Sequence, residues 1–255
     1  MNILFTICAR AGSKGVKGKN VRNFCGKPLI YYTVAAYDLF SKRYVKEKDT
    51  VVLAINTDSE VLLEQMDNLQ VDYISVQREA VLAGDIVSKK DVIKDTLVKC
   101  ERKLSIVFDT VIDLDLTSPL RTVDDINGTL ESLLQDQGAD IAFSVTNSRR
   151  SPYFNTVEKK DDGYYRTVKE TVYTTRQQTP ECYDMNASIY AYDRAYLLSD
   201  TIFQRKAVIW KMKDTGVLDI DSEEDLELME VIGTYLFEKR EGYRELFMWR
   251  EVVQE

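Results

Sequence analysis

The sequence contains no histidine among its 255 residues. A Ser-His-Asp triad, a histidine acid–base pair and a histidine-ligated zinc site are therefore excluded. Cysteine and proline are scarce, at four residues each, and the cysteines form no CxxC pair. A metal knuckle or a disulfide framework is therefore a poor interpretation. Any catalysis must use carboxylates, lysine, arginine, tyrosine, cysteine or a metal held by oxygen atoms.

Positive charge and long apolar runs are also lacking. There are 34 Lys and Arg residues against 42 Asp and Glu residues, which gives a net charge of −8. This balance disfavours nonspecific binding to nucleic acid or to an anionic membrane. No apolar run approaches the roughly 18 residues of a membrane span, and the first apolar run lacks the flanks of a signal peptide. We therefore expect a cytoplasmic protein without nucleic-acid or membrane partners.

The first half of the chain alternates between two kinds of pattern. Continuous apolar or β-branched runs predict strands at 2–8, 50–55, 71–76 and 106–114. Amphipathic stretches between them predict helices. Pro28 is expected in the first turn of one, and the others are expected to be capped by Asp58-Ser59-Glu60, Ser88 and Thr122. This alternation predicts an α/β fold with a mainly parallel sheet and helices on both of its faces.

The pattern changes after about residue 139. Strand-like runs follow at 141–146, 153–158, 164–174, 187–192 and 207–212, and Asp161-Asp162-Gly163 predicts a hairpin turn. Two helices are then expected, one capped at 221–222 and one within 240–255. We interpret residues 1–255 as a single domain with a β excursion at about 145–175.

A glycine-rich basic loop follows the first predicted strand. Gly12, Gly15 and Gly18 are interleaved with four cations, which are Arg10, Lys14, Lys17 and Lys19. Free backbone N–H groups beside cations make a polyphosphate site, and ligands of open α/β sheets bind at the carboxyl ends of strands. The loop matches neither the P-loop nor the GxGxxG pattern. We favour phosphate binding over an ordinary solvated basic loop.

Two carboxylates, Asp219 and Asp221, lie close together near the end of the chain. Alternation along an extended segment puts both on one side, where they repel unless a cation neutralises them. Mg²⁺ (or Mn²⁺) binds through one or two carboxylates together with substrate phosphates. The simpler alternative is that Asp221 or Ser222 only caps the next helix, but the phosphate loop favours the metal.

Over residues 3–232 the chain resembles the acylneuraminate cytidylyltransferases, also called CMP-sialic acid synthetases. The resemblance rests on the order and spacing of these blocks: 9–15, Lys19-Asn20, 26–30, Arg78, 82–85, Thr117-Ser118-Pro119-Leu120-Arg121, Arg176-Gln177 with Pro180, Asn186 with Ile189-Tyr190, and 219–226. It implies a nucleotide-diphosphosugar-transferase-like fold, CTP and Mg²⁺ as ligands, and release of pyrophosphate. It also implies a homodimer in which the β excursion reaches the partner subunit.

The resemblance also assigns roles to individual residues. The nucleotide would be bound by Arg10, Ala11, Ser13, Lys19, Asn20 and Arg78, and the metal by Asp219 and Asp221. The acid sugar would be bound by Asp115, Thr117, Ser118, Arg176, Gln177, Tyr183 and Asn186. Arg10, Lys19 and Asp221 would be the catalytic residues. The proton acceptor stays open among Asp221, Asp115 and water.

Three departures from the family pattern lie on the sugar side. Asp115-Leu116 replaces Gln-Pro, Phe154 stands where a lysine is usual, and Asn186-Ala187 replaces Asn-Gly. The substrate could therefore be a sialic, legionaminic or pseudaminic type of nine-carbon acid. A methyl group against Phe154 and hydrogen bonds to Asp115 would favour a deoxygenated, diacylated sugar. Alternatively, Phe154 only packs, and Asp115 only supports the turn at 117–119.

Other functions are weighed against this one. A cytidylyltransferase for Kdo or for a neutral sugar phosphate would tolerate the missing lysine, but the blocks at Arg176 and Asn186 argue against it. A non-catalytic nucleotide-binding module would lose Lys19, Asp219 or Asp221, and all three are present. A structural protein that interacts through its β excursion would have little reason to gather cations and carboxylates in these two places.

Overall fold

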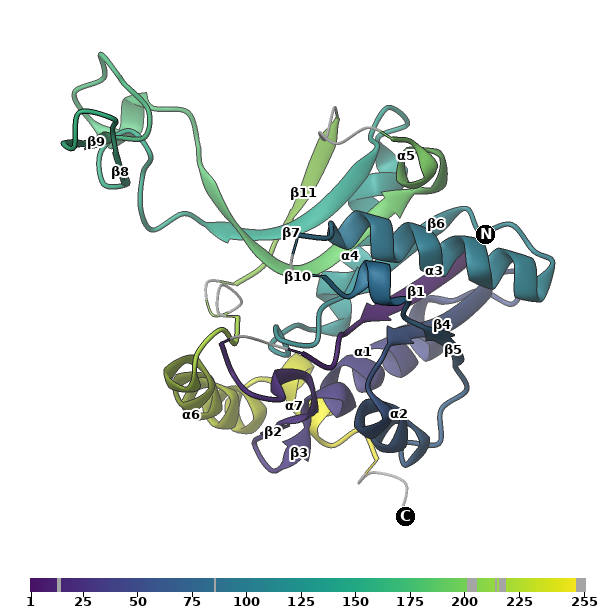
Figure 1. Ribbon diagram of the computed structural model, residues 1–255. Helices are drawn as coiled ribbons and strands as arrows, with labels where there is room; N and C mark the ends of the chain where they lie inside the picture. Colours follow the sequence, from purple (N-terminus) through teal and green to yellow (C-terminus); the bar gives the residue numbers. More distant parts are fainter. Residues whose placement is uncertain (13–14, 85, 201–205, 214, 216–218, 251–255) are drawn as a thin grey trace.

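The fold is a seven-stranded sheet with helices on both faces (Figure 1). The computed structural model describes residues 1–12, 15–84, 86–200, 206–213, 215 and 219–250. The strand order is β11-β7-β10-β6-β1-β4-β5. The strands are β1 (Asn2–Cys8), β4 (Thr50–Thr57), β5 (Ile74–Gln77), β6 (Thr110–Leu114), β7 (Ile141–Asn147), β10 (Tyr183–Asp193) and β11 (Ala207–Lys211). Among the described strands of this sheet, β10 alone runs antiparallel to its neighbours, so the mixed, mainly parallel sheet expected from the sequence is confirmed.

Two hydrophobic cores lie on opposite faces of the sheet, because alternate strand residues such as Leu4 and Phe5 belong to different cores. One core includes α3 (Lys89–Leu104) and α5 (Arg194–Leu198). The larger core includes α1 (Leu29–Tyr44), α2 (Glu60–Asp67), α4 (Val123–Gln135), α6 (Glu223–Lys239) and α7 (Glu241–Phe247). None of the described helices is long and apolar enough to cross a membrane.

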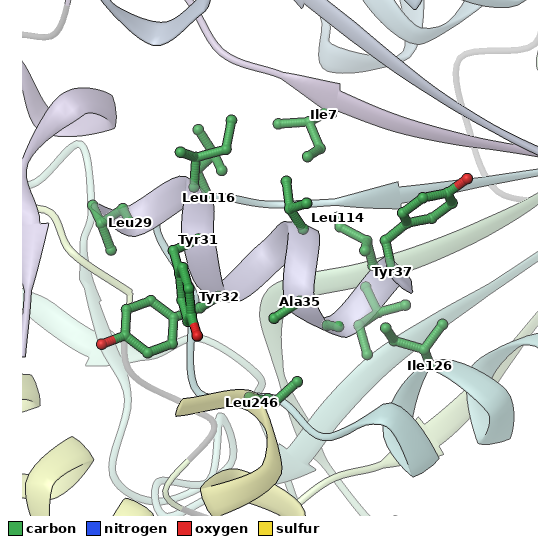
Figure 2. Packing of buried hydrophobic residues seen from close by; sticks show 14 of the residues in the cluster. Ile7, Leu29, Tyr31, Tyr32, Ala35, Tyr37, Leu114, Leu116, Ile126 and Leu246 are labelled. Carbon is green, nitrogen blue, oxygen red and sulfur yellow. The ribbon is translucent and has the colours of Figure 1, made fainter. Parts of the chain in front are cut away.

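Helix α1 anchors the region just after the glycine-rich loop. Figure 2 shows its side chains packed among residues of the sheet, α4 and α7. The Tyr32 hydroxyl donates a 2.8 Å hydrogen bond to the carbonyl of Phe24, and both side chains are buried. Phe24 belongs to a small hairpin formed by β2 (Asn23–Phe24) and β3 (Lys27–Pro28). The core therefore fixes the chain where the loop ends.

The helix caps expected from the sequence are present. Ser59 and Ser88 accept hydrogen bonds from the first turns of α2 and α3. Thr122 forms a full capping box with Asp125, and Ser222 forms another with Asp225. Each box satisfies backbone donors that a helix end leaves without partners. The Ser222 box fixes the start of α6 directly after Asp221.

The β excursion is a long arm that leaves the sheet after β7 and returns at β10 (Figure 1). It carries β8 (Val157–Lys159), β9 (Tyr165–Thr167) and the short helix η3 (Arg176–Gln178). Gly163 has a φ of +83° in the turn between β8 and β9, as the Asp-Asp-Gly motif predicts. Exposed apolar and aromatic residues mark the arm, among them Val157, Tyr164, Tyr165 and Val172.

Four predicted strands, at 71–76, 106–114, 153–158 and 164–174, are too long. In the arm, pairing is limited to β8 and β9, because this hairpin is not extended by a larger sheet. The run at 106–114 begins as strand only at Thr110. There α3 ends at Ser105 in a left-handed turn, and the Phe108 N–H is held by Glu101. Val71–Tyr73 likewise precede β5 as a connection after Gln70, whose φ is +49°.

Candidate active site

A pocket of about 300 Å³ lies where β1, β4, β5 and β6 end. Its described walls are Cys8, Arg10, Lys19, Asn20, Arg78, Leu82, Gly84, Val87, Lys89, Val92, Asp115, Thr117 and Asp219. Seven of the residues expected to be functional are thus brought together, from the first, second and last thirds of the chain. Four cations and two carboxylates face this pocket in a protein whose net charge is −8. Such a local excess of positive charge suits a polyphosphate.

The start of the glycine-rich loop is held by hydrogen bonds. The Asn20 amide donates to the carbonyl of Arg10 at 2.9 Å, which ties the two ends of the loop together. The Arg10 guanidinium donates to the carbonyl of Ala83 at 3.2 Å. The Ala11 N–H donates to Asp58, so Ala11 is held at the edge of the loop. Ser13 lies outside the described residues.

The loop contacts the segment that carries the two late carboxylates. A Cβ atom on Gly15 would lie 2.2 Å from the carbonyl oxygen of Asp221, so only glycine allows this approach. The Lys19 ammonium lies 3.0 Å from an Asp221 carboxylate oxygen. The Ile220 N–H donates to the carbonyl of Thr117 at 3.0 Å. Motifs about 200 residues apart in the sequence are therefore neighbours at one end of the sheet.

Arg78 is a pocket residue whose guanidinium is fixed by hydrogen bonds. Its Nε donates to the side chain of Asn56 at 2.9 Å, and its Nη2 donates to the Asn56 carbonyl at 3.2 Å. Asn56 is itself held by Thr96 of α3. Arg78 is only 7% exposed, so the pocket wall is rigid before any ligand binds. The sequence analysis missed Asn56, whose place in a buried strand hides a polar role.

Asp219, expected from the sequence to bind a metal, lies in the pocket wall. Its Oδ1 is buried and finds no hydrogen-bond partner within the part of the chain that the structure describes. Burial and the nearby charge of Asp115 raise the pKa of this carboxyl. Asp221 is mostly exposed and pairs with Lys19. An oxygen atom lacking a partner and a repelled charge both fit a hard divalent cation.

The described residues hold no group of three or more cysteines and carboxylates close enough to bind a metal by themselves. An ion here would draw further oxygen ligands from the substrate. That is how Mg²⁺ usually binds beside phosphates, through one or two carboxylates. The residues present therefore fit Mg²⁺ that arrives with a nucleotide.

Lys89 is a pocket residue that the sequence analysis missed. Its ammonium lies 2.8 Å from Asp113 and 2.6 Å from Asp115. Burial opposes the charge on Lys89, but the two carboxylates outweigh it and hold its pKa well above the ordinary value. Partial burial alone would raise the pKa of Asp115, yet Lys89 and Thr117 hold this pKa well below its usual range. The negative charge expected at Asp115 is thus balanced by a cation.

A signal for Lys89 existed in the sequence. Lys89 and Lys90 form the first turn of α3, where the helix macrodipole disfavours cations. Lysines in the first turn of a helix therefore indicate a compensating contact with another part of the fold. Asp115 also supports the turn that follows it, because its Oδ1 accepts hydrogen bonds from the Thr117 N–H and hydroxyl.

Ser118 and Asn186 lie behind the pocket wall. The Ser118 hydroxyl donates to the Asn186 carbonyl at 3.3 Å, and Asn186 accepts from Ser144 at 2.6 Å. Asn186 is 2% exposed, and Ala187 has a φ of +53°, which explains why glycine suits this position. In this structure the two predicted sugar residues support the wall rather than line the pocket.

The remaining predicted sugar residues belong to the arm and its base. Arg176 and Gln177 are exposed in η3, and the Arg176 guanidinium donates to the side chain of Asn155. Tyr183, at the start of β10, donates to Glu181 at 2.5 Å. None of these three is among the residues that line the pocket. The chain thus brings together Arg10, Lys19, Asn20 and Arg78, four of the residues expected to bind the nucleotide, and leaves the arm residues outside their pocket.

Comparison with known proteins agrees with this geometry. The family model described as "Cytidylyltransferase" matches residues 4–241. CMP-N,N'-diacetyllegionaminic acid synthase of Campylobacter jejuni is 38% identical over 90% of this chain and 94% of that protein. Post-translational flagellin modification protein B of Campylobacter coli is 37% identical with the same coverage of both chains.

A solved structure shares the fold. CMP:2-keto-3-deoxy-manno-octonic acid synthetase complexed with CTP aligns with a TM-score of 0.63 and 17% identity, over 92% of this chain and 99% of that one. The nucleotidyltransferase fold and the family resemblance inferred from the sequence are both confirmed. The chain belongs to the cytidylyltransferase family.

Proposed function

We propose that this protein transfers CMP from CTP to the anomeric hydroxyl of a nine-carbon acid sugar of the legionaminic type. The observation that carries the proposal is the pocket itself, where Arg10, Lys19 and Arg78 gather beside Asp219. The similarity to the diacetyllegionaminic acid synthase of C. jejuni supports the choice of sugar. Because CTP is a cytoplasmic nucleotide, we place the reaction in the cytoplasm.

The reaction is an in-line displacement at the α-phosphorus of CTP. The sugar oxygen forms a bond to this phosphorus, the bond to the β-phosphate oxygen breaks, and pyrophosphate leaves with the electron pair. Little covalent work falls on the protein, so catalysis is positioning and charge stabilisation. Arg10 and Lys19 would stabilise the charge that builds up on the phosphates. Asn20 and Arg78 would bind the cytidine.

Asp219 and Asp221 would hold Mg²⁺ in this site. When bound, the ion supplies neutralisation of the phosphate charge. Within the chain, Lys19 keeps the Asp221 carboxylate beside the glycine-rich loop. Gly15 permits that closeness, since any side chain there would collide with the Asp221 backbone.

The proton of the attacking hydroxyl needs an acceptor. Asp115 is a weak candidate, because Lys89 and Thr117 hold its pKa well below the ordinary value. Asp221 and water are the acceptors that this argument leaves. All three acceptors were open from the sequence, and the Lys89 contact argues against Asp115.

We further propose a homodimer in which each arm covers the pocket of the other subunit. Arg176 and Gln177 lie away from the pocket of their own chain, although the family resemblance assigns them to the sugar. Exposed apolar side chains on the arm, including Tyr165 and Val172, suit burial against a second copy. Both observations support completion of the sugar site in trans.

Pyrophosphate release tests this function. The enzyme is incubated with CTP, Mg²⁺ and one of four sugars: N,N'-diacetyllegionaminic acid, pseudaminic acid, N-acetylneuraminic acid or Kdo. We expect release with the nine-carbon acids and the highest kcat/KM with diacetyllegionaminic acid. Release with Kdo alone, or with none of the four, would contradict the proposal.

A further inference from the structure

The strongest unexplained feature of the pocket is the cluster of Lys89, Asp113 and Asp115. Asp113 is fully buried, whereas the side chains of Lys89 and Asp115 are 34% and 24% exposed. Lys89 and Asp115 both line the pocket, together with Asp219. An ion pair with a purely structural role would have no need to face the pocket.

The Asp115 carboxylate has one hydrogen-bond acceptor position left for a ligand. Its Oδ1 accepts two bonds from Thr117, and its Oδ2 accepts one from Lys89 at 2.6 Å. A carboxylate offers about four acceptor positions, so one remains on Oδ2. The positive charge of Lys89 lowers the pKa of Asp115 and so keeps the Asp115 carboxylate ionised. Asp115 is therefore a fixed acceptor for one O–H or N–H donor.

Lys89 determines where that acceptor points. Its ammonium is anchored by Asp113, whose other oxygen accepts a 2.7 Å bond from Thr6 of β1. The Tyr190 ring lies 5.6 Å from the same ammonium. Thr6 of β1 thus holds Asp113, Asp113 holds the Lys89 ammonium, and this ammonium holds Oδ2 of Asp115. Without Lys89, less energy would be needed to rotate the Asp115 carboxylate, and Oδ2 would no longer be held in one orientation.

We infer that Lys89 is a positioning residue that holds Asp115 ready to accept a hydrogen bond from a substrate O–H or N–H group. This inference rests on the proposed function. The donor belongs either to the ribose of CTP or to a hydroxyl or N-acyl group of the acid sugar. A positioned acceptor discriminates strongly against a substrate that lacks the matching donor.

A double-mutant cycle tests the inference. Lys89→Met, Asp115→Asn and the double variant are compared with the parent for kcat and for the KM of each substrate. We expect each single variant to raise the KM of one substrate about 10-fold or more. In the Asp115→Asn background, Lys89→Met should change that KM by less than about 2-fold, because Lys89 acts through Asp115.

Removal of Lys89 leaves Asp113 as a buried charge without its cation, which could unfold the protein. The cycle is therefore repeated in an Asp113→Asn background. Lys89→Arg keeps the charge and should restore most of the affinity. The matched control is Lys90→Met, because Lys90 is the next residue but donates to the carbonyl of Ser199. Lys90→Met should leave both KM values unchanged.

The pattern of KM values identifies the donor. A change confined to the KM of CTP assigns the donor to the ribose. One of the two analogues 2'-deoxy-CTP and 3'-deoxy-CTP then lacks the donating hydroxyl, and the KM of that analogue should not change in Lys89→Met. A change confined to the KM of the sugar assigns it to the acid sugar. Additive effects of the two substitutions, or an unchanged KM for both substrates, would overturn the inference.

Failure of the inference and failure of the proposed function are distinguishable. A parent enzyme that is inactive with every nine-carbon acid contradicts the function. In that case, calorimetry gives the Kd of CTP and of the sugar for the parent and the three variants. If the two substitutions then weaken binding additively, the role of Lys89 is overturned. An active parent with additive variants overturns the role of Lys89 alone.

Discussion

The nucleotide pocket and the arm differ in how their functional residues are held. In the pocket, Arg78 and Asp115 are each fixed by at least two contacts at the ends of parallel strands. In the arm, Arg176 and Gln177 are exposed on a short 3₁₀ turn. Rigid strand ends favour binding of a ligand common to the whole family. An arm built outside the sheet can change its contacts with the substrate at little cost to the fold.

Among changes to the pocket, loss of the metal site should lower activity the most. Asp219 lines the pocket, and its Oδ1 has no hydrogen-bond partner among the described residues, whereas Asp221 pairs with Lys19. We expect Asp219→Asn to lower kcat/KM at least about 100-fold, and EDTA to abolish activity. Asp221→Asn should cost less than Asp219→Asn, because Asp221 is mostly exposed and already paired with Lys19. The two variants are assayed over a range of Mg²⁺ concentrations, and full activity of either in EDTA contradicts the metal site.

Nucleotide choice tests whether the pocket is as specific as its rigidity suggests. We expect kcat/KM for CTP to exceed that for UTP, ATP and GTP by at least about 100-fold. Arg78→Lys should reduce this ratio about 10-fold, because lysine cannot grip Asn56 through two nitrogens. The measurement is pyrophosphate release with each nucleotide. Faster turnover with ATP or GTP would end the cytidylyl assignment.

Mixed dimers test the arm. We expect Lys19→Met and Arg176→Ala homodimers to be nearly inactive, the first through its pocket and the second through its arm. A mixture that exchanges subunits should recover up to about a quarter of the parent activity, since half of its dimers carry one competent pocket. Arg166→Ala is the control, because Arg166 pairs with Asp162 at the hairpin turn of the same arm. No recovery, or an active monomer in light scattering, contradicts completion in trans.

The sugar preference should show the smallest effect. Phe154 lies half-buried in the arm where the family pattern has a lysine. We expect the parent to favour diacetyllegionaminic acid over N-acetylneuraminic acid, and Phe154→Lys to shift the ratio of kcat/KM values toward the latter by less than about 10-fold. Thermal stability checks that the variant is folded. A parent that favours N-acetylneuraminic acid would refute the argument from position 154.

What the sequence could predict follows the same division. The strand–helix alternation and the serine and threonine caps are local signals, and the structure bears them out. The strands of the arm were overestimated, because their length depends on partners that a local pattern does not contain. Lys89 and Asn56 were missed for a similar reason. Their roles arise only when the sheet brings its strand ends together.

The central claim is that CMP is transferred intact to the sugar. CTP labelled with ³²P at the α-phosphate is incubated with N,N'-diacetyllegionaminic acid and Mg²⁺, and the products are separated. The account predicts that the label moves into the CMP-sugar, with one unlabelled pyrophosphate released for each molecule formed. Label found in free CMP without a sugar conjugate, or release of single phosphate in place of pyrophosphate, would contradict it.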